Sequence, residues 1–122
     1  MRIVTKIIIK GELTDLNTYI NAERRNRFMG AKIKKENTEN VMWQTKGIKP
    51  IVDYPVSVHM TWYVKDKKKD PDNITFAKKF ILDALVENGI LVNDGQKQIQ
   101  SFTDIILNDK EPSIHIQIVP VF

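Results

Sequence analysis

Apolar and polar residues alternate most regularly between residues 56 and 65. Val56, Val58, Met60, Trp62 and Val64 fall on one face and more polar residues on the other, which predicts a β-strand with one face in the core. Three other β-branched or alternating stretches predict strands over residues 3–10, 98–107 and 113–119.

Helices are predicted between these strands. A short helix follows the capping residue Asp15, and a long one covers about residues 26–43, where sparse apolar residues predict a largely exposed helix. A third, mostly apolar helix runs from Asp72 to about Asn88 and is stopped by Gly89. Helices inserted after the first and second strands predict an α+β domain, with helices packed on one face of a mixed or antiparallel sheet of about four strands in a two-layer arrangement.

Length and composition narrow the possibilities. A chain of 122 residues without low-complexity segments or repeats is expected to be one domain, residues 1–122. Cysteine is absent and only two histidines occur, so any bound metal would have oxygen ligands, which favours Mg²⁺ or Mn²⁺. No signal peptide, transmembrane run or lipidation motif is evident, so a cytoplasmic protein without a membrane partner is expected.

The net charge of +4 is unevenly distributed. Lysine and arginine outnumber acidic residues over residues 1–80, and the opposite holds over residues 81–122. This asymmetry favours a polyanionic partner for the surface built by the first two thirds of the chain, although a solvated helix face is an equally good explanation. The candidate phosphate contacts in this part are Arg24, Arg25, Arg27, Lys32, Lys34 and Lys35.

The segment Lys67-Lys68-Lys69-Asp70-Pro71-Asp72-Asn73 places two carboxylates directly behind three ammonium groups. Carboxylates bind divalent metal and lysines bind phosphate, so the segment suggests metal-dependent chemistry on a nucleic acid backbone. A purely structural explanation competes with this one. Asp70 as helix cap, Pro71 at the first helical position and Asp72 in the first turn would account for the motif without catalysis.

Two features of the following residues bear on this choice. On a helix that turns by about 100° per residue, three charged side chains lie within roughly 40° of one another: Asp72, Lys79 and Asp83. Nearly all other positions of this helix are apolar. This stripe is either a Lys79–Asp83 ion pair or the wall of an active site. Asp94 lies in an Asn-Asp-Gly turn; it is either a turn residue or a third metal ligand, provided that the chain returns toward Asp70.

These residues resemble the RusA family of Holliday-junction resolvases, and most of all its phage and prophage branch. The resemblance rests on Asp70-Pro71-Asp72-Asn73, then residues 80–85, and then residues 89–96, with weaker similarity over nearly the whole chain, including Asn17 and Tyr19. It implies a small α/β homodimer that cuts four-way DNA junctions symmetrically with Mg²⁺ or Mn²⁺. It also implies that Asp70, Asp72 and Asp94 are the metal-binding catalytic carboxylates.

The sequence departs from the family pattern at two places. The catalytic lysine four residues after the second aspartate is replaced by Phe76, so Lys79, on the predicted face of Asp72, is expected to act in preference to Lys78. The proline pair usual before Asn17 is absent, and Asn17 is expected to be a DNA contact.

The expected function is metal-assisted phosphodiester hydrolysis at a DNA junction. Lys67, Lys68, Lys69 and the basic residues between 24 and 35 would hold the junction arms through phosphates. Two alternatives stay open: a nuclease acting more broadly on forks and flaps, and a non-catalytic DNA-binding protein.

Overall fold

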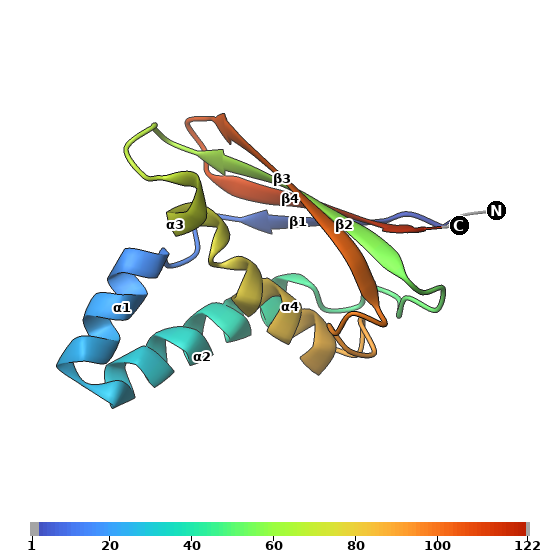
Figure 1. Cartoon of the computed structure of the whole chain (residues 1–122), viewed down its shortest axis with the longest axis horizontal. Helices are drawn as coiled ribbons and strands as arrows, with labels where there is room; N and C mark the ends of the chain where they lie inside the picture. The colour runs from blue at the N-terminus through green and yellow to red at the C-terminus, as the bar shows by residue number, and fades with distance from the viewer. Residues whose placement is uncertain (1–2, 122) are drawn as a thin grey trace.

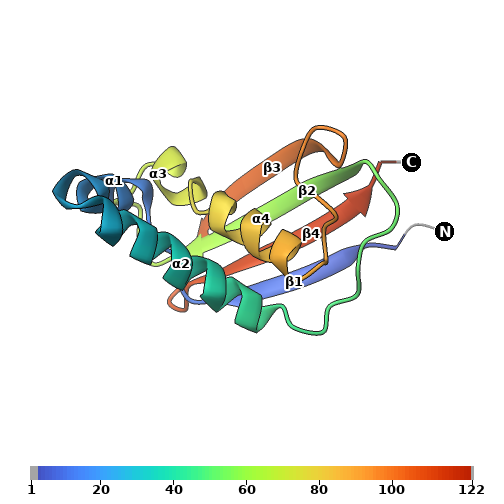
Figure 2. The same cartoon turned by 90° about the horizontal axis from the view of Figure 1, so that it is seen from below.

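The computed structural model describes residues 3–121, which form a sheet with helices on one face (Figures 1 and 2). In chain order the elements are β1 (Thr5–Lys10), α1 (Leu16–Arg25), α2 (Arg27–Gln44), β2 (Val56–Val64), α3 (Pro71–Thr75), α4 (Lys78–Glu87), β3 (Ile99–Asn108) and β4 (Ser113–Pro120). The sheet has the order β1-β4-β2-β3; β2 and β3 are parallel and the other pairs are antiparallel. The predicted α+β fold with a four-stranded mixed sheet and helices on one face is confirmed.

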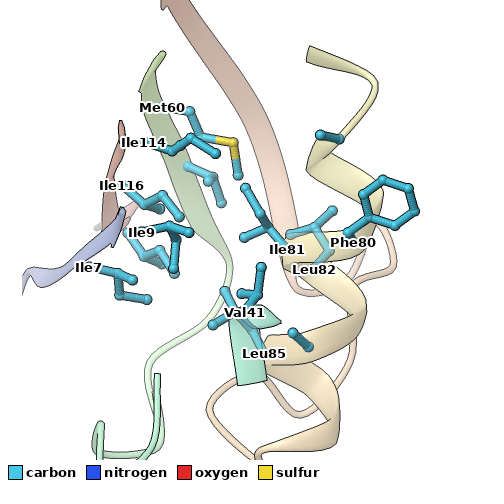
Figure 3. Close-up of a cluster of buried hydrophobic side chains, with 14 of the residues drawn as sticks. Ile7, Ile9, Val41, Met60, Phe80, Ile81, Leu82, Leu85, Ile114 and Ile116 are labelled. Carbon is cyan, nitrogen blue, oxygen red and sulfur yellow. The ribbon is translucent and has the colours of Figure 1, made fainter. Parts of the chain in front are cut away.

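The core lies between the sheet and α4. Figure 3 shows Ile81 and Leu85 of α4 directed toward the sheet, where Ile9 of β1 and Ile116 of β4 face them. All four side chains are almost completely buried. Truncating such a side chain to alanine typically costs about 2–5 kcal/mol, so this contact accounts for the placement of α4. No helix within residues 3–121 is long and apolar enough to cross a membrane.

The connection from β2 through α3 and α4 to β3 joins two parallel strands, as parallel pairing requires. In the ladder Val56 faces Ile99 and Val64 faces Asn108, so both strands run from the same end of the sheet to the other. The segment that follows β2 therefore leaves from one end of the sheet, and the segment that precedes β3 enters at the opposite end.

α1 and α2 form a hairpin with a single residue between them. Asp15 caps α1 by accepting a hydrogen bond from the Thr18 N–H at 2.8 Å. Asn26 ends α1 and caps α2 by accepting from the Phe28 N–H at 2.8 Å. The long exposed helix predicted from about residue 26 to 43 is confirmed.

The continuous helix predicted from Asp72 to about Asn88 is wrong, because the chain forms α3 and α4 with an interruption at Phe76 and Ala77. At this point the N–H groups of Ala77, Lys79 and Phe80 bond to carbonyls three residues earlier, which tightens the helix locally. The angular count that placed Lys79 on the face of Asp72 assumed an unbroken helix and does not apply across this turn.

Candidate functional site

The two aspartates of the motif stand at the start of α3. Asp70 has the extended backbone of an N-cap residue and Pro71 follows at the first helical position. The Asp70 side chain, however, makes no capping hydrogen bond. Both Asp70 and Asp72 are exposed, and neither takes part in an ion pair within residues 3–121. The structural explanation thus accounts for the backbone of the motif and for Asp72 in the first turn, but it leaves the Asp70 carboxylate without a capping bond.

Asn73 connects the motif to α1. Its side chain is buried, and its Oδ1 accepts a hydrogen bond of 2.9 Å from the backbone N–H of Asn17 in the first turn of α1. Next to this bond the Tyr19 ring packs on Phe76 with 5.3 Å between ring centroids. The resemblance grouped Asn17 and Tyr19 as one element, and the structure shows that this element packs against the aspartate-containing segment.

Phe76, which stands where the family has its lysine, belongs to an aromatic cluster. Its ring lies 5.5 Å from that of Phe80, and Tyr19 contacts both. The position is therefore used for packing between α1 and the α3–α4 turn. Any catalytic ammonium group must come from a different residue.

Lys69 is held by Asp15, the residue that caps α1. Its Nζ lies 2.8 Å from Asp15 Oδ2, and the Asp15 side chain is only 11% exposed. Burial alone would raise the pKa of Asp15, but the hydrogen bonds from Lys69 and from Thr18 outweigh it and lower that pKa. The hydrogen bond to Asp15 in turn raises the pKa of Lys69. Sequence reasoning missed this pair because 54 positions separate the two residues and no local pattern links them.

The two candidate lysines of α4 differ in their surroundings. Lys78 donates to Asp104 Oδ2 of β3 at 2.6 Å, while the Trp62 indole N–H donates to the other oxygen of the same carboxylate at 2.9 Å. Lys79 is 63% exposed and its only carboxylate partner in the described chain is Asp83, at 3.9 Å. The Lys79–Asp83 ion pair considered from the sequence is present. Lys78 has a structural role, and Lys79 is the lysine that remains accessible to a ligand.

Asp94 lies away from the other two aspartates. It lines a groove between α2 and α4 together with Lys34, Asp83 and Glu87, near the start of β3. Figures 1 and 2 show the orange segment after α4 at the end of that helix remote from α3. Within residues 3–121 no group of three His, Cys, Asp or Glu side chains is placed to hold a metal ion. The expected return of Asp94 toward Asp70 and Asp72 does not occur within a single chain, because β3 starts at the opposite end of the sheet.

The predicted DNA contacts form two separate exposed groups. Lys67 and Lys68 lie in the loop after β2, directly before Asp70, and join no ion pair of the described residues. The hairpin of α1 and α2 carries the second group, with Asn17 at its start; its exposed cations include Arg24, Arg25, Arg27, Lys32, Lys34 and Lys35. Lys34 lies 3.8 Å from Asp83 and Lys35 lies 4.0 Å from Glu39. Lys32 is 3.9 Å from Glu36.

Neither a scan against models of known protein families nor a search of curated proteins finds a match to this sequence. The chemistry of the site is therefore inferred from its own residues. They are a pair of accessible carboxylates beside accessible lysines, on a segment fastened to α1, with a projecting basic hairpin next to it.

Proposed function

We propose that this chain is a structure-selective endodeoxyribonuclease that resolves four-way DNA junctions by Mg²⁺-dependent phosphodiester hydrolysis with paired, symmetric nicks. One observation carries the proposal: Asp70 occupies a helix-cap position without using its carboxylate there, and Asp72 beside it is equally exposed. Lys67 and Lys68 precede this pair on the same loop. The resemblance of the motif to the RusA family supplies the substrate and the reaction class.

The two carboxylates fit a magnesium ion, or Mn²⁺ in its place. Mg²⁺ in enzymes that act on phosphates is usually bound by one or two carboxylates, with waters and substrate phosphate completing its coordination. Asp70 and Asp72 offer hard oxygen ligands that no internal cation neutralises in the described structure. When bound, such a metal lowers the pKa of a coordinated water and offsets charge on the reacting phosphate.

Asp94 is the third proposed ligand. Because a single chain holds it near Asp83 and away from Asp72, we propose that the partner protomer supplies it. Symmetric cutting of a two-fold junction independently calls for a two-fold dimer with one active site per cut strand.

The cations have separate proposed roles. Lys79 holds the scissile phosphate or orients the attacking water, since its ammonium group is exposed and only loosely paired with Asp83. Lys67 and Lys68 grip the phosphates next to the cut. The basic side chains of α1 and α2 hold an arm of the junction. Contacts of this kind make binding strongly dependent on salt.

The test is Asp72→Asn, which keeps the shape of the side chain and removes its charge. With labelled four-way junctions and Mg²⁺, the variant is expected to bind normally and to lose cutting, while Asp53→Asn in an exposed loop serves as the matched control. Chelation of the metal should abolish cutting by the unaltered protein. Undiminished cutting by Asp72→Asn would refute the assignment.

A competing function is DNA binding without catalysis. It is favoured by the position of much of the positive charge on α1 and α2 rather than beside Asp70. Metal-independent binding with no nicking of any branched substrate would establish it. Preferential cutting of forks or flaps over four-way junctions would instead indicate a nuclease of broader structural selectivity.

A further inference from the structure

The apex of the α1–α2 hairpin, residues 24–29, exposes a large aromatic ring. Phe28 lies in the first turn of α2 and is 69% exposed, and the next residue, Met29, is 43% exposed. Figures 1 and 2 both place this apex at the end of the molecule opposite the two chain termini. Single exposed apolar residues are common on protein surfaces, so the surroundings of this ring decide whether it marks a contact site.

The apex is built to hold this ring in place. Asn26 is the only residue between the two helices, and its side chain caps α2 through the N–H of Phe28 itself. Gly30 is buried against α1, where a Cβ would lie 2.4 Å from Glu23 Cγ, so a larger residue at this position would require the Glu23 side chain to move. The cap therefore fixes the backbone at Phe28, and a ligand that contacts the ring has to order little more than the side chain itself.

The charge around the ring identifies the class of partner. Arg24, Arg25 and Arg27 are exposed at the apex, and no acidic residue occurs from position 24 to 35. The Arg27 guanidinium carbon lies 5.2 Å from the centroid of the Phe28 ring. Arginines grip phosphates while an aromatic ring stacks on a base, which is the usual composition of a surface that binds unpaired nucleotides. A symmetric contact between two such apices would oppose like charges and is therefore disfavoured.

We propose that Phe28 stacks on an unstacked base at the branch point of the DNA substrate while Arg24, Arg25 and Arg27 contact the neighbouring phosphates. The inference rests on the proposed function for its substrate, because continuous base stacking along a DNA duplex is interrupted at a branch point. The ten residues of α1 separate the apex from the anchor at Asn73 by about 15 Å, since an α-helix rises about 1.5 Å per residue. At about 3.4 Å per nucleotide, this distance places the stacked base roughly four or five nucleotides from the phosphate at Asp70 and Asp72.

The experiment measures binding without cutting. A four-way junction with 2-aminopurine at the branch point, and a linear duplex carrying the same base, are titrated with protein in chelator. The unaltered protein is expected to change the fluorescence of the junction only. Phe28→Ala should abolish that change and weaken junction binding by about 5- to 150-fold, the factor that corresponds to about 1–3 kcal/mol for one stacked base. Phe28→Trp should retain both.

Trp43→Ala is the matched control, because Trp43 is also an exposed aromatic residue of α2 with a cation, Lys46, over its ring. It lies in the last turn of the helix and should bind the junction like the unaltered protein. Since Phe28 is exposed, its alanine variant should keep the thermal midpoint of the parent, which verifies that the fold is intact.

Two results would overturn the inference. One is a Phe28→Ala protein that binds the junction and changes its fluorescence like the parent. The other is a Phe28→Ala protein that sediments as a smaller oligomer than the parent and still changes the fluorescence of the junction. That result would make the apex a protein interface. Failure of the proposed function looks different: the parent would show the Phe28-dependent fluorescence change in chelator and still cut no strand when Mg²⁺ is added.

Discussion

Lys69 is the residue for which the sequence and the structure make opposite predictions. Its place in the run of three lysines predicts a phosphate contact, whereas the structure pairs its ammonium group with Asp15 at 2.8 Å. Replacing Lys69 with methionine removes the charge and keeps most of the apolar stem. We expect the substitution to destabilise the fold and to leave DNA binding nearly unchanged.

The magnitude follows from the surroundings of the pair. Because Lys69 is 44% exposed, the contribution of the ion pair to the free energy of unfolding falls in the range of surface pairs. Asp15 is poorly exposed, which puts this contribution near the top of that range, at about 1 kcal/mol. Asp15→Ala should cost about 2 kcal/mol, because it also removes the cap on the Thr18 N–H, worth about 1 kcal/mol. A double-mutant cycle of the two should therefore give a coupling energy of about 1 kcal/mol.

The pair also predicts a dependence on pH. The pKa of Asp15 is lowered from 3.8, so its contribution is present above that value and is lost as pH falls through the lower folded pKa. The pKa of Lys69 is raised from 10.5, so its contribution is present below that value and is lost as pH rises through the higher folded pKa. The difference in stability between the parent and Lys69→Met should be constant between these limits and shrink outside them.

Urea unfolding at neutral pH and below pH 3.8, together with junction binding at several salt concentrations, tests this reasoning. Lys68→Met is the control: it should leave stability unchanged and lower the salt dependence of binding. If Lys69→Met has the unfolding midpoint of the parent at neutral pH and instead lowers the salt slope by about one ion, Lys69 is a phosphate contact and the structural assignment is wrong.

Two further predictions concern the reaction. Lys79→Ala should reduce junction cutting without changing the thermal midpoint. Lys78→Ala should lower the thermal midpoint, because it leaves Asp104 without its cation. If Lys78→Ala instead loses more cutting than Lys79→Ala and keeps its stability, the roles of the two lysines are reversed. Asp72→Asn and Asp94→Asn are each expected to be inactive alone. When the two proteins are unfolded together and refolded, about half of the dimers are mixed, and each mixed dimer has one intact site of two. The mixture should therefore regain up to about a quarter of the parental cutting. Mixed dimers without activity would place both aspartates in the same protomer's site. An Asp94→Asn protein that cuts by itself would place Asp94 outside the site.

The regular elements were predictable because their signals are local. Alternating residues such as Val58 and Met60 determine which face of β2 is buried, and Asp15 and Asn26 mark the helix starts where the structure has them. The interruption of the third predicted helix at Phe76 was not predictable in this way. Both Phe76 and the following Ala77 keep right-handed helical dihedrals, and the change is a shift in hydrogen-bond spacing beside the Tyr19 ring, which is a tertiary contact.

The position of Asp94 was unpredictable for a different reason. The number of residues after a helix limits how far the chain can travel, but the strand order decides where it goes. Here β3 pairs in parallel with β2, so the chain must return to the start of β2 before the new strand begins. An antiparallel β3 would have started next to the end of β2 and brought Asp94 toward Asp70.

The residues on either side of the two aspartates give the strongest physical argument for a site at the start of α3. Lys69 pairs with Asp15, and Asn73 accepts from the N–H of Asn17, so the segment is fastened to the first turn of α1 at both ends. Asp70 and Asp72 lie within this fastened segment and contribute to neither contact. If the segment served folding alone, a carboxylate at a helix-cap position would be expected to gain about 1 kcal/mol by capping, as Asp15 does at α1. Asp70 makes no such capping bond, although its neighbours fix the backbone around it. This arrangement is expected of preorganised ligands for a cation that the folded chain does not itself supply.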